Sequence, residues 1–169
     1  MKVLKEKGSL HFVVQYHIAT RVHFDFRLEY NGVLLSFAVP KGPSLNPQDK
    51  RLAVMVEDHP IKYRNFEGTI PKGNYGAGTV IIWDEGYYMP LADFDKGLND
   101  GSLKFILSGK RLQGSFALIK IKNAANKNKN NWLLIKENDI YAKSDSGISD
   151  FITSVRTNRT VQHISGKEL

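Results

Sequence analysis

The segment from Val22 to Tyr30 constrains this chain most, because apolar and polar side chains alternate along all of it. Successive residues of a β-strand point to opposite faces of the sheet. The two faces are an apolar set of Val22, Phe24, Phe26, Leu28 and Tyr30, and a polar set of His23, Asp25, Arg27 and Glu29. The polar set combines two kinds of metal ligand with an anion-binding guanidinium, whereas a solvated strand face usually carries Lys, Thr, Ser or Gln. The pattern therefore predicts a functional site on a strand.

The composition is that of a basic globular domain without cysteine. The chain has 169 residues, enough for one hydrophobic core and few for two. Without cysteine, disulfides and thiolate metal sites are excluded, and any metal must be bound by histidine, carboxylate or backbone oxygen. The net charge of +7 favours polyanionic partners such as nucleic acid, although a merely soluble basic protein has the same charge. No apolar run has membrane-spanning length and the first residues do not resemble a signal peptide, so we expect a cytoplasmic protein.

An Asn-Gly pair at positions 31 and 32 follows the alternating segment and predicts a tight β-hairpin. Pairing across this turn puts Arg27 opposite Ser36 and Asp25 opposite Ala38. Small residues opposite a polar face leave space above the sheet, so we expect Ser36 and Ala38 to form the floor of a pocket. The same register predicts four apolar pairs: Tyr30 with Val33, Leu28 with Leu35, Phe26 with Phe37, and Phe24 with Val39.

The rest of the chain is a series of short strands with Gly- and Pro-containing turns, which predicts one mainly β domain, a barrel or a sandwich. Further strands are expected at 10–16, 51–57, 79–83, 103–107, 116–121 and 132–136, with a turn at 84–86 and a short helix at 91–99. In strand 51–57, Leu52, Val54 and Val56 should point inward. The glycine-rich loop 73–78 precedes a strand rather than a helix, so we interpret it as a turn and not as a phosphate-binding loop.

The chain is predicted to have three parts. Residues 1–9 should be a flexible lead and residues 10–138 the barrel or sandwich domain. Residues 139–169 should be a tail that packs on the same domain and contains one short helix around 148–155. The basic, low-complexity loop at 122–131 should be mobile.

His23 and Asp25 form half of a metal site, because residues i and i+2 of a strand point the same way. His17 lies just before the strand and could fold back as a third ligand. A His–Asp pair that exchanges a hydrogen bond beside solvent is the alternative. Arg27 offers a rigid fork that matches phosphate oxygens, and Glu29 could orient it or a ligand. The alternative for these two residues is a surface ion pair.

A second group of chemically active residues follows the hairpin, and its members are Lys41, Arg51, Glu57, His59 and Tyr63. Arg51, Glu57 and His59 share one side of a strand and its exit. Two further cations and a histidine on a second strand suit an anionic group that undergoes acid–base chemistry. A loop-capping role for His59 and a packing role for Tyr63 are the alternatives.

Five motifs follow one another along the chain, at Val14–Glu29, Phe37–Pro43, Lys50–Pro60, Phe66–Gly78 and Val80–Asp84. Together they closely resemble the 3′-phosphoesterase domain of the DNA ligase D family. The resemblance runs from about Phe12 to Lys136, and the ending at 154–165 is similar to the family's tail. No polymerase or ligase segment accompanies these motifs, so we expect a stand-alone member.

The resemblance implies a compact β-barrel of about eight strands, with a crescent-shaped active-site groove and one or two short helices. It implies an enzyme that removes a 3′-terminal ribonucleoside and then the 3′-phosphate, leaving a 3′-OH. Mn²⁺, with Co²⁺ or Zn²⁺ as other candidates, would be bound by His17, His23 and Asp25. The positions that match the family's phosphate-binding, catalytic or supporting residues are Arg27, Lys41, Arg51, Glu57, His59 and Tyr63.

The roles and partners implied by the family are specific. His59 would be a general acid or a hydrogen-bond donor to phosphate, and Tyr63 a second donor to phosphate. The expected substrates are duplex primer–templates with a terminal ribonucleotide or a 3′-phosphate. A separate ligase and polymerase of an end-joining system are the expected protein partners.

Two other functions are compatible with the same residues. His23, Asp25 and His59 also fit the two-His-one-carboxylate iron site of an oxygenase, although the neighbouring cations favour a phosphate substrate. A non-catalytic module that binds nucleic-acid ends is the second. For an enzyme, Asp25→Ala or His59→Ala should abolish turnover with little loss of fold, because both side chains are expected on an exposed face.

Overall fold

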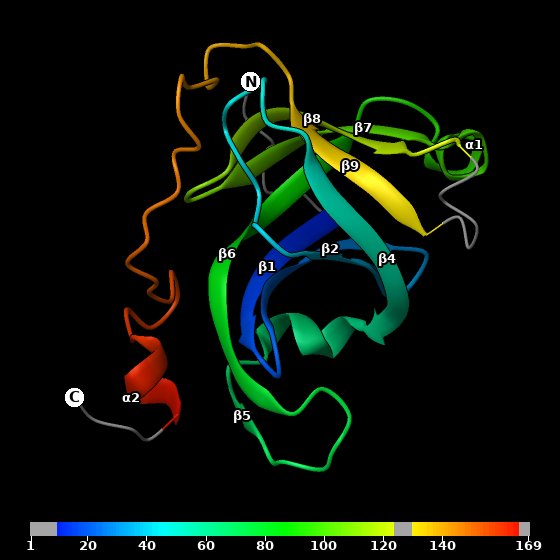
Figure 1. The fold of residues 1–169 in the computed structure, drawn as a ribbon. Helices are drawn as coiled ribbons and strands as arrows, with labels where there is room; N and C mark the ends of the chain where they lie inside the picture. Colours follow the sequence, from blue (N-terminus) through cyan, green and yellow to red (C-terminus); the bar gives the residue numbers. More distant parts are fainter. Residues whose placement is uncertain (1–9, 124–129, 166–169) are drawn as a thin grey trace.

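The computed structural model describes residues 10–123 and 130–165 (Figure 1). The predicted flexible lead at 1–9 and most of the predicted mobile loop, residues 124–129, lie outside the described residues. The elements are β1 Leu10–Ile18, β2 Val22–Tyr30, β3 Val33–Val39, β4 Arg51–Pro60, the 3₁₀-helix η1 Ile61–Asn65, β5 Gly68–Ile70, β6 Gly78–Pro90, α1 Phe94–Asp100, β7 Ser102–Gly109, β8 Gln113–Lys120, β9 Asn131–Lys136 and α2 Val161–Ser165.

Eight of the strands form a closed antiparallel barrel. Their order is β1-β2-β3-β4-β9-β8-β7-β6, and β6 closes the barrel by pairing with β1. The short strand β5 pairs with the first residues of β6 as an extra strand. The expected mainly β barrel of about eight strands with one or two short helices is therefore confirmed.

The hairpin of β2 and β3 has the predicted register. Asn31 and Gly32 adopt positive φ angles of 50° and 80°, as a type I′ turn requires. Arg27 pairs with Ser36, and all four predicted apolar pairs are present. A slip of one residue would exchange the two faces of the strand, so this turn determines where the polar side chains lie.

Aromatic side chains from opposite walls fill the barrel interior. Phe26 of β2 is fully buried and stacks on Phe105 of β7, with ring centroids 5.9 Å apart. Phe37 of β3 meets Trp132 of β9 edge to face at 5.7 Å. Such pairs contribute about 0.5–1.5 kcal/mol each beyond their buried area. Because the apolar face of β2 points inward, its polar face lies on the outside of the barrel wall.

β6 continues through the turn that was predicted at 84–86, so that prediction is wrong. Asp84 is fully buried, and its carboxylate accepts hydrogen bonds from the backbone N–H groups of residues 110–112. Gly86 packs so closely on β7 that a Cβ there would collide with the carbonyl oxygen of Ser108. Residues 84–86 thus form a closely paired stretch of strand next to a β-bulge. Within it, the carboxylate of Asp84 binds a neighbouring loop.

The inward face of β4 is the opposite of the predicted one. Ala53 is fully buried and Met55 packs against the core, whereas Leu52 is 41% exposed. Ala53 pairs with Trp132 of β9, and Met55 pairs with Phe37 of β3. Directly paired residues share a face of the sheet, so the pairing partners and not the hydrophobicity of β4 decide which side faces inward.

A β-bulge in β4 changes which side its later residues face. The register between β3 and β4 shifts by one residue between Leu34 and Ser36, so β4 carries an extra residue there. Val56 and His59 therefore share the outer face although they are three residues apart. Arg51, which pairs with a core residue of β9, points to the other side. The common side predicted for Arg51 and His59 is wrong for this reason.

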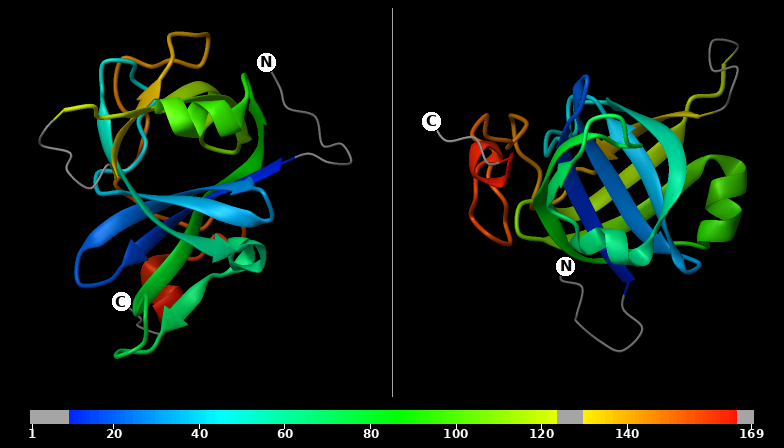
Figure 2. Two further views of the ribbon diagram at one scale, coloured as in Figure 1. Left: turned by 90° about the vertical axis from the view of Figure 1, so that its right-hand side faces the viewer. Right: turned by 90° about the horizontal axis from the view of Figure 1, so that it is seen from below.

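The tail contains a helix, but α2 lies C-terminal to the predicted position. Residues 148–155 are not helical. Instead, the N–H of Val155 donates to the carbonyl of Ile82 in β6 at 3.0 Å, and Thr153 forms a β-bridge with Thr160. These bonds use backbone groups that a helix would have used. Figure 2 shows the C-terminal segment and α1 on opposite sides of the barrel.

Candidate functional site

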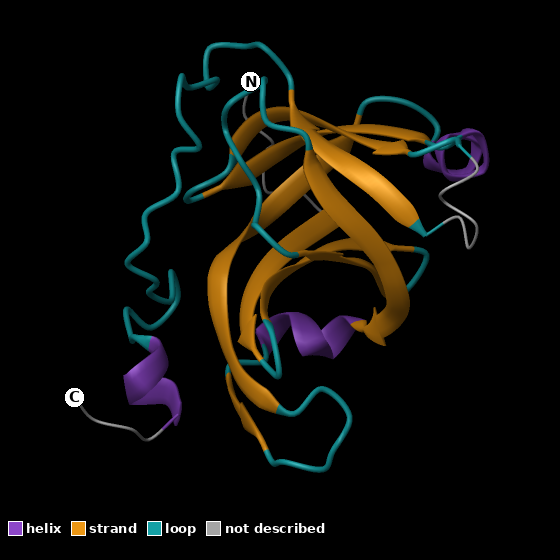
Figure 3. Cartoon of the chain, viewed as in Figure 1, coloured by secondary structure: helices purple, strands orange, loops and turns teal. Residues whose placement is uncertain are grey.

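A pocket of about 580 Å³ lies on the outer face of the barrel wall. Its lining comes from β1, β2 and β3, from the end of β4 with η1, and from the connection between β5 and β6. Figure 3 shows η1 below β2, between the lower ends of β4 and β6. Seven of the predicted site residues line it: His17, His23, Asp25, Arg27, Glu57, His59 and Tyr63.

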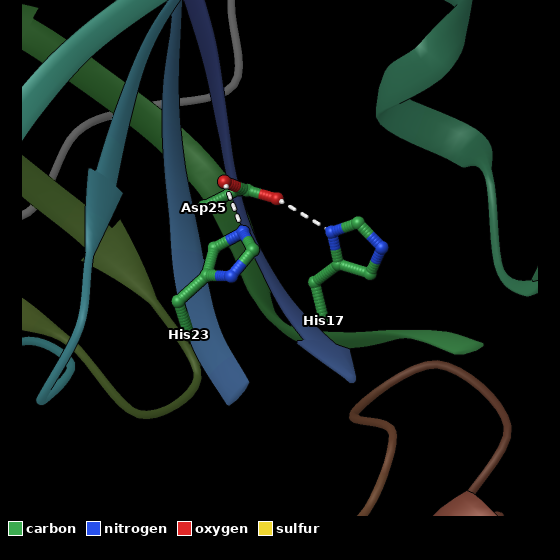
Figure 4. A group of neighbouring side chains, drawn as sticks. All are labelled: His17, His23 and Asp25. Atoms are coloured by element: carbon green, nitrogen blue, oxygen red, sulfur yellow. Dashed lines mark ion pairs between the residues drawn. The ribbon is translucent and has the colours of Figure 1, made fainter. Parts of the chain in front are cut away.

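His17, His23 and Asp25 form the centre of the site, with ligand atoms that all lie within 4.8 Å of one another (Figure 4). Nδ1 of His17 is 3.5 Å from Oδ2 of Asp25, and Nε2 of His23 is 3.1 Å from Oδ1. The cluster forms because β1 pairs with β2 so that His17 lies directly opposite His23. Two imidazoles and one carboxylate are a donor set that suits a divalent transition metal.

Both imidazole rings are oriented by a second hydrogen bond to the backbone. Nε2 of His17 lies 3.0 Å from the carbonyl oxygen of Gly76, and His23 is hydrogen-bonded to the backbone of Arg21. A ring N–H that donates to a carbonyl leaves the other ring nitrogen free to bind an ion, which is the usual arrangement around metal-binding histidines. The residues of the cluster therefore fit a divalent ion.

Asp25 is buried, with 6% of its surface exposed, and the predicted exposed face is wrong for this residue. The end of β4, η1 and the β5–β6 connection surround the pocket in which it lies. Burial opposes ionisation, but hydrogen bonds to His17 and His23 and the charge of Arg27 outweigh it and hold the pKa of Asp25 well below its usual range. A hydrogen bond to Asp25 in turn raises the pKa of His23. The carboxylate is therefore ionised near neutral pH.

Arg27 lies buried beside the cluster and is held by four side chains. Its Nε donates to Oε1 of Gln15 at 2.7 Å, and its Nη1 contacts Oγ of Ser36 at 2.9 Å and Nδ1 of His59 at 3.2 Å. Its Nη2 is 3.3 Å from Oδ2 of Asp25. The hydrogen bonds to described residues use Nε and Nη1, so Nη2, which forms the ion pair with Asp25, can donate to a ligand.

His59 and Tyr63 lie next to Arg27 in the pocket. Their rings are 5.0 Å apart, and the guanidinium of Arg27 is 5.1 Å from the centre of the Tyr63 ring. Burial and the charge of Arg27 lower the pKa of His59, so its ring is neutral at neutral pH. Nδ1 contacts Arg27 and the Glu57 carbonyl, which leaves Nε2 for the pocket. His59 thus contacts the guanidinium of Arg27. Among the described residues, the second histidine of the metal-type cluster is His17 and not His59.

Gln15 is a site residue that the sequence analysis missed. It is fully buried on β1, and its amide donates to the carbonyls of Tyr63 at 2.9 Å and Phe66 at 3.1 Å. Because its Oε1 accepts from Arg27, it links the guanidinium to η1. The available signal was its position two residues before His17, on the same face of a strand.

Two supporting residues differ from their predicted arrangement. The carboxylate of Glu29 does not orient Arg27 but contacts the ring of His11 at 3.1 Å and accepts the N–H of His11 at 2.9 Å. The reason is that Glu29 lies one pleat further along β2, beside the first residues of β1. Of the predicted floor, Ala38 lines the pocket, whereas Ser36 is fully buried and holds Arg27.

Lys41 and Arg51 are not part of the pocket lining. Lys41 is exposed just after β3, and Arg51 lies 3.6 Å from the carboxylate of Asp49. Their phosphate-binding roles stay predictions. Glu57 lines the pocket with an exposed side chain, next to Asp58, which the sequence analysis did not single out.

The C-terminal segment holds the far end of η1. Arg156 donates to the carboxylate of Glu85 on β6 at 3.0 and 2.5 Å, and to Oδ1 of Asn65, the last residue of η1, at 3.1 Å. The hydroxyl of Thr157 donates to Glu67 at 2.7 Å. The tail thus supports the helix that carries one wall of the pocket.

A family model described as the DNA Ligase D 3′-phosphoesterase domain matches residues 15–120, more than half of the chain. The chain belongs to the DNA ligase D 3′-phosphoesterase family. The match begins at Gln15 and includes the metal-type cluster, Arg27, His59 and Tyr63. The resemblance inferred from the five sequence motifs is thereby confirmed.

Curated relatives of this 3′-phosphoesterase domain are much longer proteins. The multifunctional non-homologous end joining protein LigD of Pseudomonas aeruginosa is 53% identical over 137 residues, which are 81% of this chain and 16% of that protein. The protein of the same name from Mycolicibacterium smegmatis is 39% identical over 163 residues, which are 93% of this chain and 20% of that protein. The chain therefore spans at most about a fifth of these relatives. Among the described residues, no helix has the length and apolar character needed to cross a membrane.

Proposed function

We propose that this domain is a metal-dependent phosphoesterase that repairs 3′ ends of nucleic acids for end joining. The proposed reactions are hydrolysis that releases a 3′-terminal ribonucleoside and leaves a 3′-phosphate, and hydrolysis of that phosphate to a 3′-OH. The main support is the buried cluster of His17, His23 and Asp25 with Arg27 beside it. Membership in the 3′-phosphoesterase family and the names of the LigD relatives support the same conclusion.

Mn²⁺ is the proposed ion, and Co²⁺ and Zn²⁺ suit the same donors. His17 and His23 would hold it through ring nitrogens, and Asp25 through its carboxylate. When bound, a divalent ion supplies Lewis-acid stabilisation of the charge on a phosphoryl group.

Arg27 would bind the phosphoryl group through Nη2, while Nε and Nη1 are held by Gln15, Ser36 and His59. The guanidinium does not have to reorganise when charge develops on the phosphate, because those partners already fix it. The Asp25 carboxylate offsets the charge of Arg27, so a divalent ion on the cluster would supply the net positive charge that suits this end of the pocket to an anion.

His59, Tyr63 and Glu57 would handle protons. Burial raises the pKa of the Tyr63 hydroxyl, which therefore stays protonated and can donate to a phosphoryl oxygen. Nε2 of the neutral His59 ring would donate a hydrogen bond to a phosphoryl oxygen. The carboxylate of Glu57, which is exposed and lines the pocket, would accept a proton from the attacking water.

The proposed substrates are duplex primer–templates that end in a ribonucleotide or a 3′-phosphate, with a ligase and a polymerase acting alongside. The net charge of +7 supports binding to the phosphate backbone. Binding should therefore weaken steeply as salt increases, with little dependence on sequence.

The decisive experiment is incubation of the purified protein with Mn²⁺ and a primer–template that ends in one ribonucleotide. Products are resolved by length and by 3′ chemistry. We expect a shortened strand with a 3′-phosphate that is converted to a 3′-OH, and no conversion in EDTA. Phosphate release without oxygen or a 2-oxoacid would also exclude the oxygenase, whereas oxygen uptake without release would contradict the proposal.

A matched pair of variants separates an enzyme from a binding module. His59→Gln should abolish turnover and leave binding to duplex ends intact, because His59 is not in the metal-type cluster. Lys96→Gln is the control, since among the described residues this exposed side chain on α1 bonds only to Asp100 within its own helix. If neither the natural protein nor the control shows turnover with Mn²⁺, Co²⁺ or Zn²⁺ while both bind ends, the domain is a binding module.

A further inference from the structure

Tyr75 and Gly76 of the connection between β5 and β6 line the pocket at its opening to solvent, and Figure 1 shows this connection below η1. Its backbone is held at Gly76, whose carbonyl accepts from Nε2 of His17 at 3.0 Å. Two turns stiffen it: the N–H of Asn74 donates to the carbonyl of Pro71 at 3.2 Å, and the N–H of Ala77 donates to that of Asn74 at 3.1 Å. The loop is thus tied to the metal-type cluster.

Tyr75 stands out on this loop because it lines the pocket and is nevertheless 77% exposed. The neighbouring ring of Tyr63 is packed between His59 at 5.0 Å and Phe66 at 5.2 Å. Over residues 10–123 and 130–165, no second aromatic ring packs against Tyr75. A large ring on a fixed backbone is therefore left in solvent at the pocket mouth.

A substrate held by its phosphate would bring a flat surface to this ring. On the proposed function, the end of the pocket with Arg27 and the metal-type cluster would hold the phosphoryl group, while apolar Ile70, just before the loop, packs near Gly76. The nucleoside attached to that phosphate must then extend towards the opening of the pocket. Every base has a π face, so stacking on an aromatic ring holds a nucleotide without reading its sequence.

We propose that Tyr75 stacks on the base of the 3′-terminal nucleotide of the substrate. This rests on the proposed function, and it adds a requirement for a base of any identity next to the scissile phosphate. The carbonyl of Gly76 accepts a hydrogen bond from His17, so the ring of Tyr75 and the phosphate site keep a constant separation. The loop at 73–78, which the sequence predicts to be a turn, would thus also contact the substrate.

The test compares two duplexes with a 3′-phosphate, one with a normal terminal nucleotide and one with a stable abasic residue in its place. Tyr75→Ala should lower kcat/KM on the normal substrate by about 5- to 100-fold, mainly through KM, and leave the abasic substrate unchanged. Tyr75→Phe keeps the ring and should match the natural protein. Phe151→Ala, which removes another exposed ring outside the pocket, is the control.

A binding readout makes the test independent of turnover. With 2-aminopurine as the 3′-terminal base and the protein in EDTA, stacking should quench fluorescence, and Tyr75→Ala should lose most of that quenching. In the kinetic comparison, an equal loss of kcat/KM on the normal and the abasic substrate, or no loss on either, would overturn the proposal. If the natural protein has no phosphoesterase activity, the proposed function fails, and unchanged quenching in Tyr75→Ala would then overturn the stacking contact as well.

Discussion

Replacing Asp25 by asparagine removes one negative charge from the cluster and keeps the size of the side chain. The structure predicts a large loss of stability, contrary to the expectation from sequence that this residue can be changed with little effect on the fold. Asp25 is 6% exposed, and its partner Arg27 is 3% exposed. Without the carboxylate, the guanidinium would stay buried with a weakened partner.

The size of the loss follows from the distance between the two charges. At 3.3 Å and an effective dielectric constant of about 20, the attraction is roughly 5 kcal/mol. Asparagine is easier to bury than an ionised carboxylate, which offsets part of this. We therefore expect Asp25→Asn to lower the free energy of unfolding by about 3–5 kcal/mol, as is usual when one partner of a buried ion pair is removed.

The assay is urea unfolding in EDTA, which measures the pair without any metal. The double variant Asp25→Asn with Arg27→Met should be more stable than the sum of the two single losses predicts, by about 1 kcal/mol or more, because both charges are gone. Mn²⁺ should raise the melting temperature of the natural protein and leave that of Asp25→Asn unchanged.

A loss below about 0.5 kcal/mol for Asp25→Asn, typical of surface changes, would refute the reasoning. It would mean that water reaches the pair and that the exposed strand face expected from sequence is the better description. If the loss of unfolding free energy in the double variant equals the sum of the two single losses, the two side chains are not coupled, which would also refute the reasoning.

Three further predictions concern the rest of the fold. Burial outweighs the backbone hydrogen bonds and raises the pKa of Asp84 to about 6, so the stability it contributes is full below pH ~4 and lost as the pH rises through ~6. The difference in unfolding free energy between the natural protein and Asp84→Asn should therefore change by about 2 kcal/mol from pH 4 to 7, and a flat difference would contradict this. Arg156→Ala should lower turnover by about 2- to 10-fold by loosening η1, whereas Lys96→Ala, which removes an ion pair on α1, should leave it unchanged in the same kinetic assay. Gly86→Ala should cost about 1–3 kcal/mol in thermal or urea unfolding, because its Cβ would collide with β7; an unaffected midpoint would show that the two strands can separate there.

Local patterns determined much of the site. Alternation along β2 separated the apolar and polar faces correctly, and the Asn-Gly turn set the pairing of Arg27 with Ser36. These features depend on the pleat of one strand and on the positive φ angles of one turn, which neighbouring residues control. The five motifs, all of them local stretches of sequence, also identified the family.

Tertiary structure decided which strands meet and which faces are covered. The pairing of β1 with β2 brings His17 to the cluster and Gln15 to Arg27, and the bulge in β4 moves His59 to the outer face. The end of β4, η1 and the β5–β6 connection then close around a strand face that alternation alone marks as exposed, so Asp25 is buried. These outcomes depend on contacts between residues far apart in the sequence, and strand periodicity carries no information about them.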